Sequence, residues 1–370
     1  MAKIGILQIG ALALALSHAA SGEDLFVYFG THTAGPGKGF SLAHFDTATG
    51  ALSKPEFLLE APAPAYFIIA PDGKHLYTCN STGFVSAYAI DRATAHLTLL
   101  NQVPSGGGDP SYISLDRTAR YVFVANYAGG NIAAWKLEPD GSIGARTAFV
   151  QHTGSGVNPQ RQSHAFAHSI RVDLTNRFVL VGDLGVDKVF VYKFDVKDGS
   201  LTPNDPPFVS VKPGSGARHV VFHPNGRWVY LITELGNTVI QFDWDAERGR
   251  LKELQTVSTL PADFKGTSNC SEIMIHPNGK FLYGSNRGHD SIAVFAIDAK
   301  SGRLTPIEYV PSGGQTPRNF DFDPSGRWML VTNHGNNMAM VFRVDETTGK
   351  LTPVGKPVEV PYPFCPRFLK

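Results

Sequence analysis

The sequence predicts an all-β fold, a seven-bladed β-propeller built from four-stranded antiparallel blades. The first observation is a pattern that recurs along the chain, of which residues 217–234, ARHVVFHPNGRWVYLITE, are one copy. The second is the spacing of the copies, 46 to 57 residues, which suits one propeller blade per copy. The third is a copy divided between the two ends of the chain. Helical segments do not alternate with the strands, which argues against a parallel α/β fold.

Each full copy begins with two apolar runs joined by a turn rich in Asp, Asn, Gly or Pro. A third strand ending near an acidic residue and a short fourth strand complete the blade. The paired runs are residues 65–80, 111–126, 168–183, 217–234, 271–286 and 318–333. Turn residues such as Asp116 and Asp173 are interpreted as turn formers, and so are His223 and His276 in the two HPNG turns.

The seventh copy is split. Residues 25–33, LFVYFGTHT, resemble a second strand without a first, and residues 364–370, FCPRFLK, resemble a first strand without a second. Joined, they form one blade, so we expect the C-terminal strand to close the ring against the N-terminal strands. Closure removes the open sheet edges that favour aggregation. The sequence thus predicts a single propeller domain over residues 24–370.

The N-terminal segment differs from the rest of the chain. A lysine, an apolar stretch from Ile4 to Leu16 and small residues around Ala19 predict a signal peptide over residues 1–20. The apolar stretch is shorter than the roughly 20 residues that a membrane helix needs. We therefore expect a periplasmic or secreted protein that makes no membrane contact after cleavage.

The charge, the cysteines and the absence of certain motifs in the sequence argue against several kinds of partner and cofactor. The formal net charge is +1 and no run of Lys and Arg exceeds two residues, which argues against a nucleic-acid partner. Cys79, Cys270 and Cys365 are widely spaced and form no CxxC motif, so we interpret them as buried apolar residues. The sequence contains no HExxH, GxSxG or Walker motif, and we predict neither a cofactor nor an essential metal.

The repeat also predicts which polar residues gather at one mouth of the central channel. The start of each first strand and the end of each second strand share one face of a propeller. The first-strand positions are Ala65, Ser111, His168, Arg218, Ser271, Arg318 and Cys365, and the second-strand positions are Thr31, Asn80, Asn126, Asp183, Glu234, Asn286 and Asn333. Charged residues concentrate in the third to sixth full copies, which favours an anionic or carbonyl ligand. The plainer alternative is a rim of solvated ion pairs, each worth about 0–1 kcal/mol.

From these positions and their neighbours we predict a set of substrate-binding residues. They are Asp183, His219, Glu272, Asn286, His289, Arg318 and Asn319.

Three segments carry a resemblance to a known family: 217–239, ARHVVFHPNGRWVYLITELGNTV, 271–298, which contains YGSNRGHDSIAVF, and 315–326, QTPRNFDFDPSG. They resemble the seven-bladed propeller lactonases, which include propeller-type 6-phosphogluconolactonases and, more distantly, 3-carboxy-cis,cis-muconate lactonising enzymes. The resemblance extends over residues 25–370. It implies a catalytic group of His168, Arg218, Glu234 and Arg287. The chain departs from the family pattern in SHAFAHS, where Phe166 stands at the first position of a usual His-x-His, with His164 nearby.

The resemblance implies hydrolysis of a lactone, a small-molecule substrate. Glu234 or His168 would act as general base, and Arg218 and Arg287 would stabilise the oxyanion or bind a substrate anion. If Glu234 is held by Arg218 it serves to orient, which favours His168 as the base. Two alternatives stay open. One is the reverse, lactonising reaction on an unsaturated organic acid, and the other is a non-catalytic propeller that binds a ligand or partner at its mouth. The identity of the lactone and the oligomeric state are left open as well.

Overall fold

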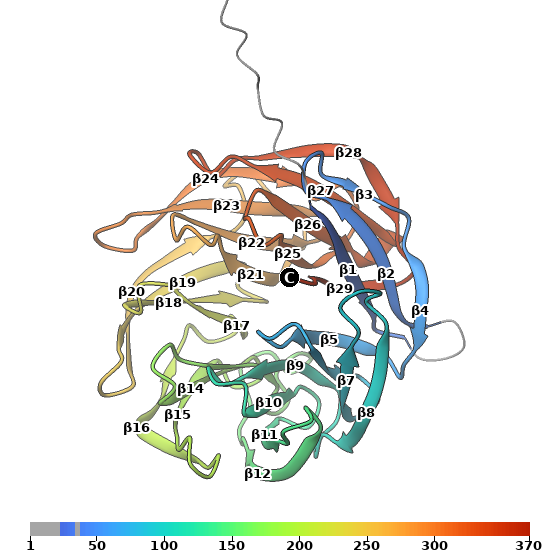
Figure 1. The fold of residues 1–370 in the computed structure, drawn as a ribbon. Helices are drawn as coiled ribbons and strands as arrows, with labels where there is room; N and C mark the ends of the chain where they lie inside the picture. The colour runs from blue at the N-terminus through green and yellow to red at the C-terminus, as the bar shows by residue number, and fades with distance from the viewer. Residues whose placement is uncertain (1–22, 34–37) are drawn as a thin grey trace, which may run out of the picture.

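Seven antiparallel sheets are arranged as blades around a central axis in the computed structural model, which describes residues 23–33 and 38–370 (Figure 1). The predicted all-β, seven-bladed propeller is confirmed. The predicted signal peptide, residues 1–20, lies outside the described residues. No helix in 23–33 and 38–370 has the length and apolar character needed to cross a membrane.

Each blade is a meander that runs from the channel outward. The first strands, which line the channel, are β29 (Pro363–Phe368), β5 (Pro64–Ile69), β9 (Pro110–Leu115), β13 (Ala167–Val172), β17 (Ala217–Phe222), β21 (Asn269–Ile275) and β25 (Pro317–Phe322). The second strands are β1 (Asp24–Thr31), β6 (His75–Asn80), β10 (Tyr121–Asn126), β14 (Phe178–Asp183), β18 (Trp228–Thr233), β22 (Phe281–Arg287) and β26 (Trp328–Asn333).

The outer half of each blade is more exposed. The third strands are β2 (Gly39–Asp46), β7 (Phe84–Ile90), β11 (Asn131–Leu137), β15 (Lys188–Phe194), β19 (Thr238–Asp245), β23 (Ser291–Ile297) and β27 (Met338–Val344). The outermost strands are β3 (Ala51–Leu52) with β4 (Glu56–Glu60), β8 (Leu97–Pro104), β12 (Ile143–Gln151), β16 (Leu201–Ser210), β20 (Arg250–Ser258), β24 (Leu304–Pro311) and β28 (Leu351–Glu359). A 3₁₀ turn, η1 (His334–Asn336), follows β26.

The ring closes as the split repeat predicts. Strand β29 pairs antiparallel with β1, with Phe29 opposite Pro366 and Val27 opposite Phe368. In the same sheet β1 pairs with β2, so the first blade combines both ends of the described chain.

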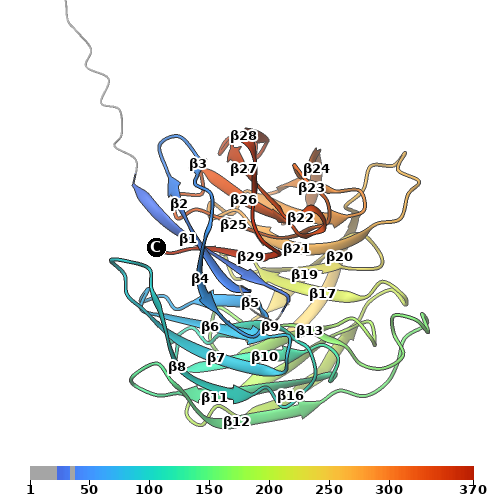
Figure 2. The ribbon, with the colours of Figure 1, turned by 90° about the vertical axis from the view of Figure 1, so that its right-hand side faces the viewer.

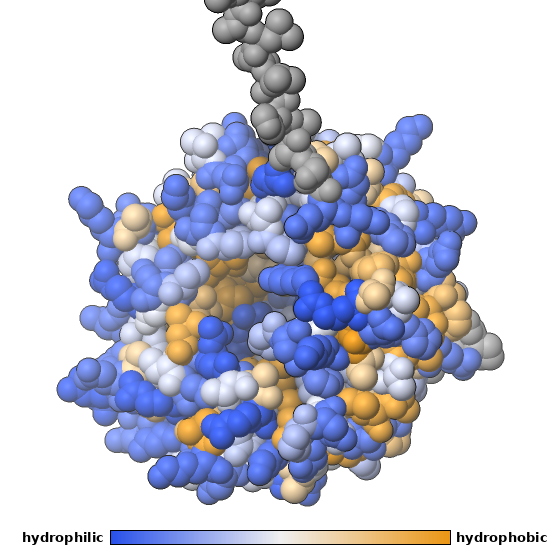
Figure 3. All heavy atoms as spheres, in the orientation of Figure 1, coloured by the Kyte–Doolittle hydropathy of each residue, from blue (hydrophilic) through white to orange (hydrophobic). Residues whose placement is uncertain are grey.

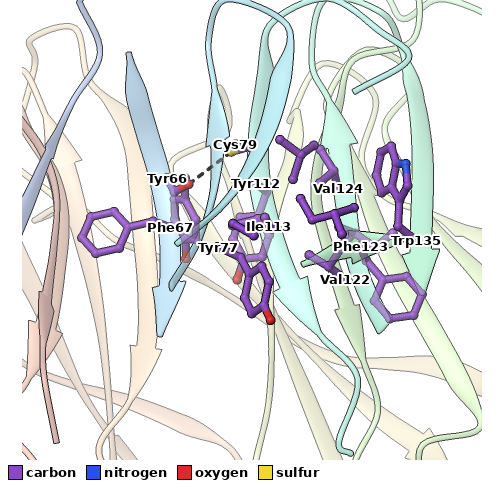
Figure 4. Close-up of a cluster of buried hydrophobic side chains, with 14 of the residues drawn as sticks. Tyr66, Phe67, Tyr77, Cys79, Tyr112, Ile113, Val122, Phe123, Val124 and Trp135 are labelled. Atoms are coloured by element: carbon purple, nitrogen blue, oxygen red, sulfur yellow. Dashed lines mark hydrogen bonds between the residues drawn. The ribbon is translucent and has the colours of Figure 1, made fainter. Parts of the chain in front are cut away.

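The core lies between neighbouring blades. Second strands such as β10 and β14 are buried along their whole length, because a neighbouring blade covers each of their faces. Figure 4 shows one such contact, with side chains of β5 and β6 facing those of β9, β10 and β11. The labelled residues are Tyr66, Phe67, Tyr77, Cys79, Tyr112, Ile113, Val122, Phe123, Val124 and Trp135. Cys79, Cys270 and Cys365 are buried and unpaired, as predicted.

A recurring hydrogen bond ties each of several blades to the next. The hydroxyl of Tyr230 in β18 donates to the carbonyl of Gly302 at 2.6 Å, in the turn between β23 and β24 of the following blade. Tyr28, Tyr77 and Tyr283 donate in the same way to Ala95, Gly141 and Gly349. Burial raises the pKa of all four hydroxyls. These bonds give a buried Tyr hydroxyl the partner it requires.

The turn histidines also link blades. His223 Nε2 lies 2.8 Å from the carbonyl of Gly279, and His276 Nε2 lies 2.8 Å from the carbonyl of Gly326, each in the HPNG-type turn of the next blade. These turns share one face of the ring with the C-terminus, which lies on the left in Figure 2. The opposite face, on the right in Figure 2, carries the starts of the first strands and the loops that enter them.

Candidate active site

An irregularity in the inner strands aims side chains at the channel mouth. In β13, Ala167 pairs with Asp183 and Ser169 with Gly182, so His168 between them has no partner across the ladder. The same bulge isolates Arg218 in β17 and Arg318 in β25. A bulge leaves one residue out of register and turns its side chain away from the usual alternation. The first strands therefore present extra side chains at their mouth ends.

Two positions predicted from the repeat are wrong by a single residue. Thr233, and not Glu234, pairs with Ala217 and ends β18 as Asp183 ends β14, so Glu234 is the first residue after the strand. In the blade that closes the ring, Gly30 pairs with Cys365 and Thr31 with Pro363, so the bulged residue is Phe364. Cys365 is fully buried in the core. The period of the repeat cannot locate a bulge to the residue, because the alternation of apolar side chains shifts there by one.

The bulged side chains surround a cavity of about 180 Å³ at the mouth. Its lining combines residues from five of the bulges with residues of the loops above them. The lining residues are His32, Ala65, Ser81, Asp109, Ser111, Tyr127, Arg161, His168, Glu234, Arg287, Arg318 and Phe364. Arg218 lies directly behind this lining and is 1% exposed.

Glu234 is the centre of the site. Its Oε2 lies 2.8 Å from Arg218 Nε, 3.1 Å from Arg287 Nη2 and 3.7 Å from His168 Nε2. The structure thus brings together the four residues of the predicted catalytic group. Burial alone would raise the pKa of Glu234, but Arg287 and Arg218 outweigh it and hold the pKa well below its usual range. Glu234 is accordingly a carboxylate at neutral pH and a weak proton acceptor.

A third guanidinium, that of Arg161, binds the carboxylate of Glu234 in addition to those of Arg218 and Arg287. Arg161 Nη2 donates to Glu234 Oε1 at 2.5 Å. Arg161 belongs to the long segment between β12 and β13, and its side chain is 38% exposed, so it approaches from the solvent side. The sequence reasoning missed this residue because the segment has no counterpart in the repeat. A basic residue in an unusually long loop that leads into a first strand was the feature of the sequence that could have indicated it.

His168 is a neutral imidazole in this setting. Burial, followed by Arg218 and His219, lowers its pKa well below the ordinary value of 6.5. Its Nδ1 has no hydrogen-bond partner among the described residues. The ring packs edge-on against Tyr127 with centroids 5.2 Å apart, which fixes its orientation. A neutral, held imidazole beside a permanent carboxylate can accept a proton.

Arg318 contributes a separate positive charge to the cavity. No acidic side chain of the described residues lies within salt-bridge distance of it, and its guanidinium stacks over the Phe364 ring at 4.4 Å. Burial, Arg218 and Arg287 lower the pKa of Arg318, and the carboxylates of Glu234 and Asp109 offset only part of that effect. An anionic or carbonyl oxygen in the cavity would offset more of it.

Two predicted binding residues do not line the cavity but form hydrogen bonds with the loops around it. Asp183 accepts hydrogen bonds from His152 Nδ1 at 2.7 Å and from the backbone N–H of Phe166 at 2.8 Å. Asn286 Nδ2 donates to the carbonyl of Thr259 at 2.8 Å. Both side chains are fully buried and fasten the loops that enter the first strands.

Three others lie one layer deeper in the channel. His219 Nδ1 is 2.9 Å from Glu272 Oε1, and Asn319 Nδ2 donates to Glu272 Oε2. All three are at most 2% exposed. His289 lies outside both groups, with Nδ1 2.6 Å from Ser291 Oγ and its ring against Phe264. Of the seven predicted binding residues, the structure places Arg318 on the cavity wall.

The cavity is lined by imidazole, carboxylate and guanidinium groups. Among the residues that the structure describes, no three His, Cys, Asp or Glu side chains are grouped as metal ligands would be. Three guanidiniums already satisfy Glu234. The fold and the cavity define a propeller with a cationic, imidazole-containing pocket at its mouth.

Comparison with known proteins agrees with this description. The family model for "Lactonase, 7-bladed beta-propeller" matches residues 26–368. A 6-phosphogluconolactonase of Bacillus subtilis is 36% identical over 345 residues, which are 92% of this chain and 97% of the relative. The solved structure of a periplasmic gluconolactonase from Pseudomonas aeruginosa superposes with a TM-score of 0.89 at 33% identity, covering 94% of this chain and 99% of that one. The chain belongs to the seven-bladed β-propeller lactonase family.

Proposed function

We propose that this protein hydrolyses a sugar lactone in the mouth cavity, with His168 as general base and without a metal ion. The observation that carries the proposal is the arrangement around Glu234. Arg161, Arg218 and Arg287 bind that carboxylate, whereas the neutral His168 lies 3.7 Å from it and lines the cavity. Membership of the lactonase family and the names of the two relatives support the reaction class.

The proposed reaction needs only groups of this chain, the lactone and water. His168 removes a proton from water, and the oxygen of that water bonds to the lactone carbonyl carbon. The carbonyl oxygen gains negative charge, which Arg287 or Arg318 stabilises. The bond from the carbonyl carbon to the ring oxygen then breaks, and the ring oxygen takes the proton from His168. The product is a hydroxy acid, and the imidazole is again neutral.

Glu234 acts as a positioning residue in this scheme. Its charge fixes the guanidiniums of Arg161 and Arg287 at the cavity wall and favours the imidazolium of His168 while the proton resides there. General-base catalysis contributes roughly 100- to 10,000-fold to a rate.

We further propose that the protein is exported, because residues 1–20 have the pattern of a signal peptide. Export favours a sugar lactone without a phosphate group, as in the name of the periplasmic gluconolactonase relative. Fractionation of cells producing the full-length chain tests the location. Recovery of uncleaved protein in the cytoplasm would refute export.

The test of function is a panel of lactones with the purified protein, including glucono-δ-lactone and 6-phosphoglucono-δ-lactone, corrected for uncatalysed hydrolysis. His168→Ala and Glu234→Gln are each expected to lower kcat/KM at least tenfold while the protein stays folded. His96→Ala is the matched control, because His96 is exposed in the turn between β7 and β8 on the opposite face. Wild-type rates in both site variants would refute the assignment.

A further inference from the structure

A second cavity, of about 270 Å³, opens at the other end of the channel. Figure 3 shows the face that carries the C-terminus, and the ring is hollowed at its centre there. The lining includes Arg171 of β13, Arg367 of β29, Asp321 of β25 and, at the rim, Arg117. No residue lining this cavity also lines the cavity at the mouth.

The two inner arginines have unused hydrogen-bond donors. Within residues 23–33 and 38–370, Arg171 makes one side-chain hydrogen bond, from Nε to the hydroxyl of Tyr112 at 2.6 Å. Toward the same described part of the chain, Arg367 donates through Nη1 alone, to Asn319 Oδ1 at 2.9 Å and to the carbonyl of Pro366. Among the described residues, no carboxylate lies within salt-bridge distance of either guanidinium. Both side chains are half-buried, so water replaces only part of the missing partners.

The positions of these guanidiniums are fixed in advance. Arg367 lies over the ring of Tyr66 at 5.0 Å, and the Tyr66 ring stacks on that of Tyr112 at 4.4 Å. Tyr112 in turn accepts the hydrogen bond from Arg171. A rigid pair of guanidiniums binds carboxylate or phosphate oxygens well, because little side-chain entropy is lost.

Asp321 lines the same cavity, and its carboxylate, with that of the buried Glu272, favours the charge of Arg367 without forming an ion pair with it among the described residues. Asp321 accepts hydrogen bonds from the backbone N–H of Phe322 at 3.0 Å and of Phe368 at 3.4 Å. The lining therefore has three guanidiniums against one carboxylate. Asp321 remains available to accept a hydrogen bond from a hydroxyl group of a ligand.

A buried polar layer separates the two cavities. It consists of His219, Glu272 and Asn319, and Arg367 reaches it through its hydrogen bond to Asn319. His219 in turn packs against His168, with ring centroids 5.1 Å apart. The second cavity is thus distinct from the mouth but connected to it by a continuous series of contacts.

We propose that this second cavity binds a small organic anion, whose carboxylate or phosphate group is held by Arg171 and Arg367. Unused guanidinium donors, a fixed geometry, a lining with more guanidiniums than carboxylates and an open cavity all favour such a ligand. Asp321 favours a ligand with a hydroxyl group next to the anionic group.

Titration calorimetry of the full chain with two probes, inorganic phosphate and D-gluconate, tests the proposal. Arg318→Gln serves as the background, since it removes from the mouth a cation that forms no ion pair among the described residues. In that background Arg171→Gln is expected to weaken binding of at least one probe tenfold or more, while Arg227→Gln leaves it unchanged. Arg227 is a suitable control because it is exposed in a turn on the same face and outside the cavity lining. The probe that binds more tightly tells whether phosphate or carboxylate is the preferred group.

Crystals soaked with selenate give an independent readout, because the anomalous signal of selenium locates the anion. A peak between Arg171 and Arg367 supports the proposal. A peak confined to the mouth overturns it, as does equal affinity of the Arg318→Gln protein with and without Arg171→Gln. Arg171→Lys, which keeps the charge but not the planar fork, controls for a loss of folding and is expected to retain part of the affinity.

Discussion

Replacing Glu234 with Gln should destabilise the propeller strongly, although Gln has almost the same shape. The substitution removes the charge that compensates Arg218, which is 1% exposed. Breaking a buried ion pair by removing one partner costs about 3–5 kcal/mol, because a buried charge is left without compensation. The carbonyl of Ser271 remains as an acceptor for Arg218, but it carries no formal charge.

The expected shift in melting temperature follows from the size of the domain. Unfolding entropy is about 2.1 cal/mol/K per residue, which gives about 0.7 kcal/mol/K for the roughly 350 residues of the propeller. A loss of 3–5 kcal/mol then corresponds to a decrease of about 4–7 °C. Differential scanning calorimetry of the two proteins at pH 7 measures it.

The effect should depend on pH with a definite sign. The folded-state pKa of Glu234 is depressed below the ordinary value of 4.5, so its charge stabilises the fold fully above that value. The stability is lost as pH falls through the folded-state pKa. The difference in melting temperature between wild type and Glu234→Gln should therefore be constant from neutral pH to about pH 5 and shrink in stronger acid.

A double-mutant cycle identifies the source of the loss. Arg218→Met removes the buried cation, so Glu234→Gln should cost less in that background than in the wild type. Equal melting temperatures for wild type and Glu234→Gln at pH 7 would refute the reasoning. So would a cost that is the same with and without Arg218, since the pair would then not be coupled.

Three further outcomes are expected. If neutral His168 is the base, kcat/KM for the lactone should stay level above pH 6.5 and fall below it, at the depressed pKa of His168, and a decline that begins above pH 6.5 would contradict this. Arg161→Ala should lower kcat with little loss of stability, because its side chain is 38% exposed, and unchanged kinetics would remove it from the site. Tyr230→Phe should cost about 1–2 kcal/mol in urea unfolding, since the carbonyl of Gly302 loses its buried donor, whereas an equally stable variant would show that water replaces the hydroxyl.

The architecture could be predicted well from the sequence because every blade of a propeller is encoded by the same pattern of strands and turns. Alternating apolar runs, turns and a fixed spacing recur in every blade, so an error in one copy is corrected by the others. The closing of the ring by β29 and β1 followed from the same logic, as a copy missing its first strand needs one from elsewhere. The placement of His168 and Arg218 at the mouth followed from their common position in the repeat.

The site was harder to predict where polar residues near the mouth hold the loops in place and do not contact the cavity. Asp183 and Asn286 lie at or next to the ends of second strands, just as Glu234 follows one, yet they bind loop backbone and do not line the cavity. A buried strand end must satisfy the polar groups of the adjoining loop, and Asp and Asn do so as well as they bind ligands. Sequence position alone cannot separate the two uses. Arg161 could not be predicted because it lies in an irregular loop. Such a loop has no counterpart in the repeat, so the repeat cannot tell where its side chains lie.

The arrangement around Glu234 bears on the question that the sequence left open, whether this carboxylate takes a proton or holds Arg218. A base must give up its ion pairs when it is protonated, and Glu234 would have to release three guanidiniums at once. His168 has no such obligation, because its imidazole is already neutral and its Nδ1 has no partner among the described residues. Burial, Arg218 and Arg318 oppose protonation of His168, and Glu234, 3.7 Å away, offsets part of that opposition. Taking a proton would break three ion pairs at Glu234 and none at His168, and this favours Glu234 as the residue that positions the cations around it.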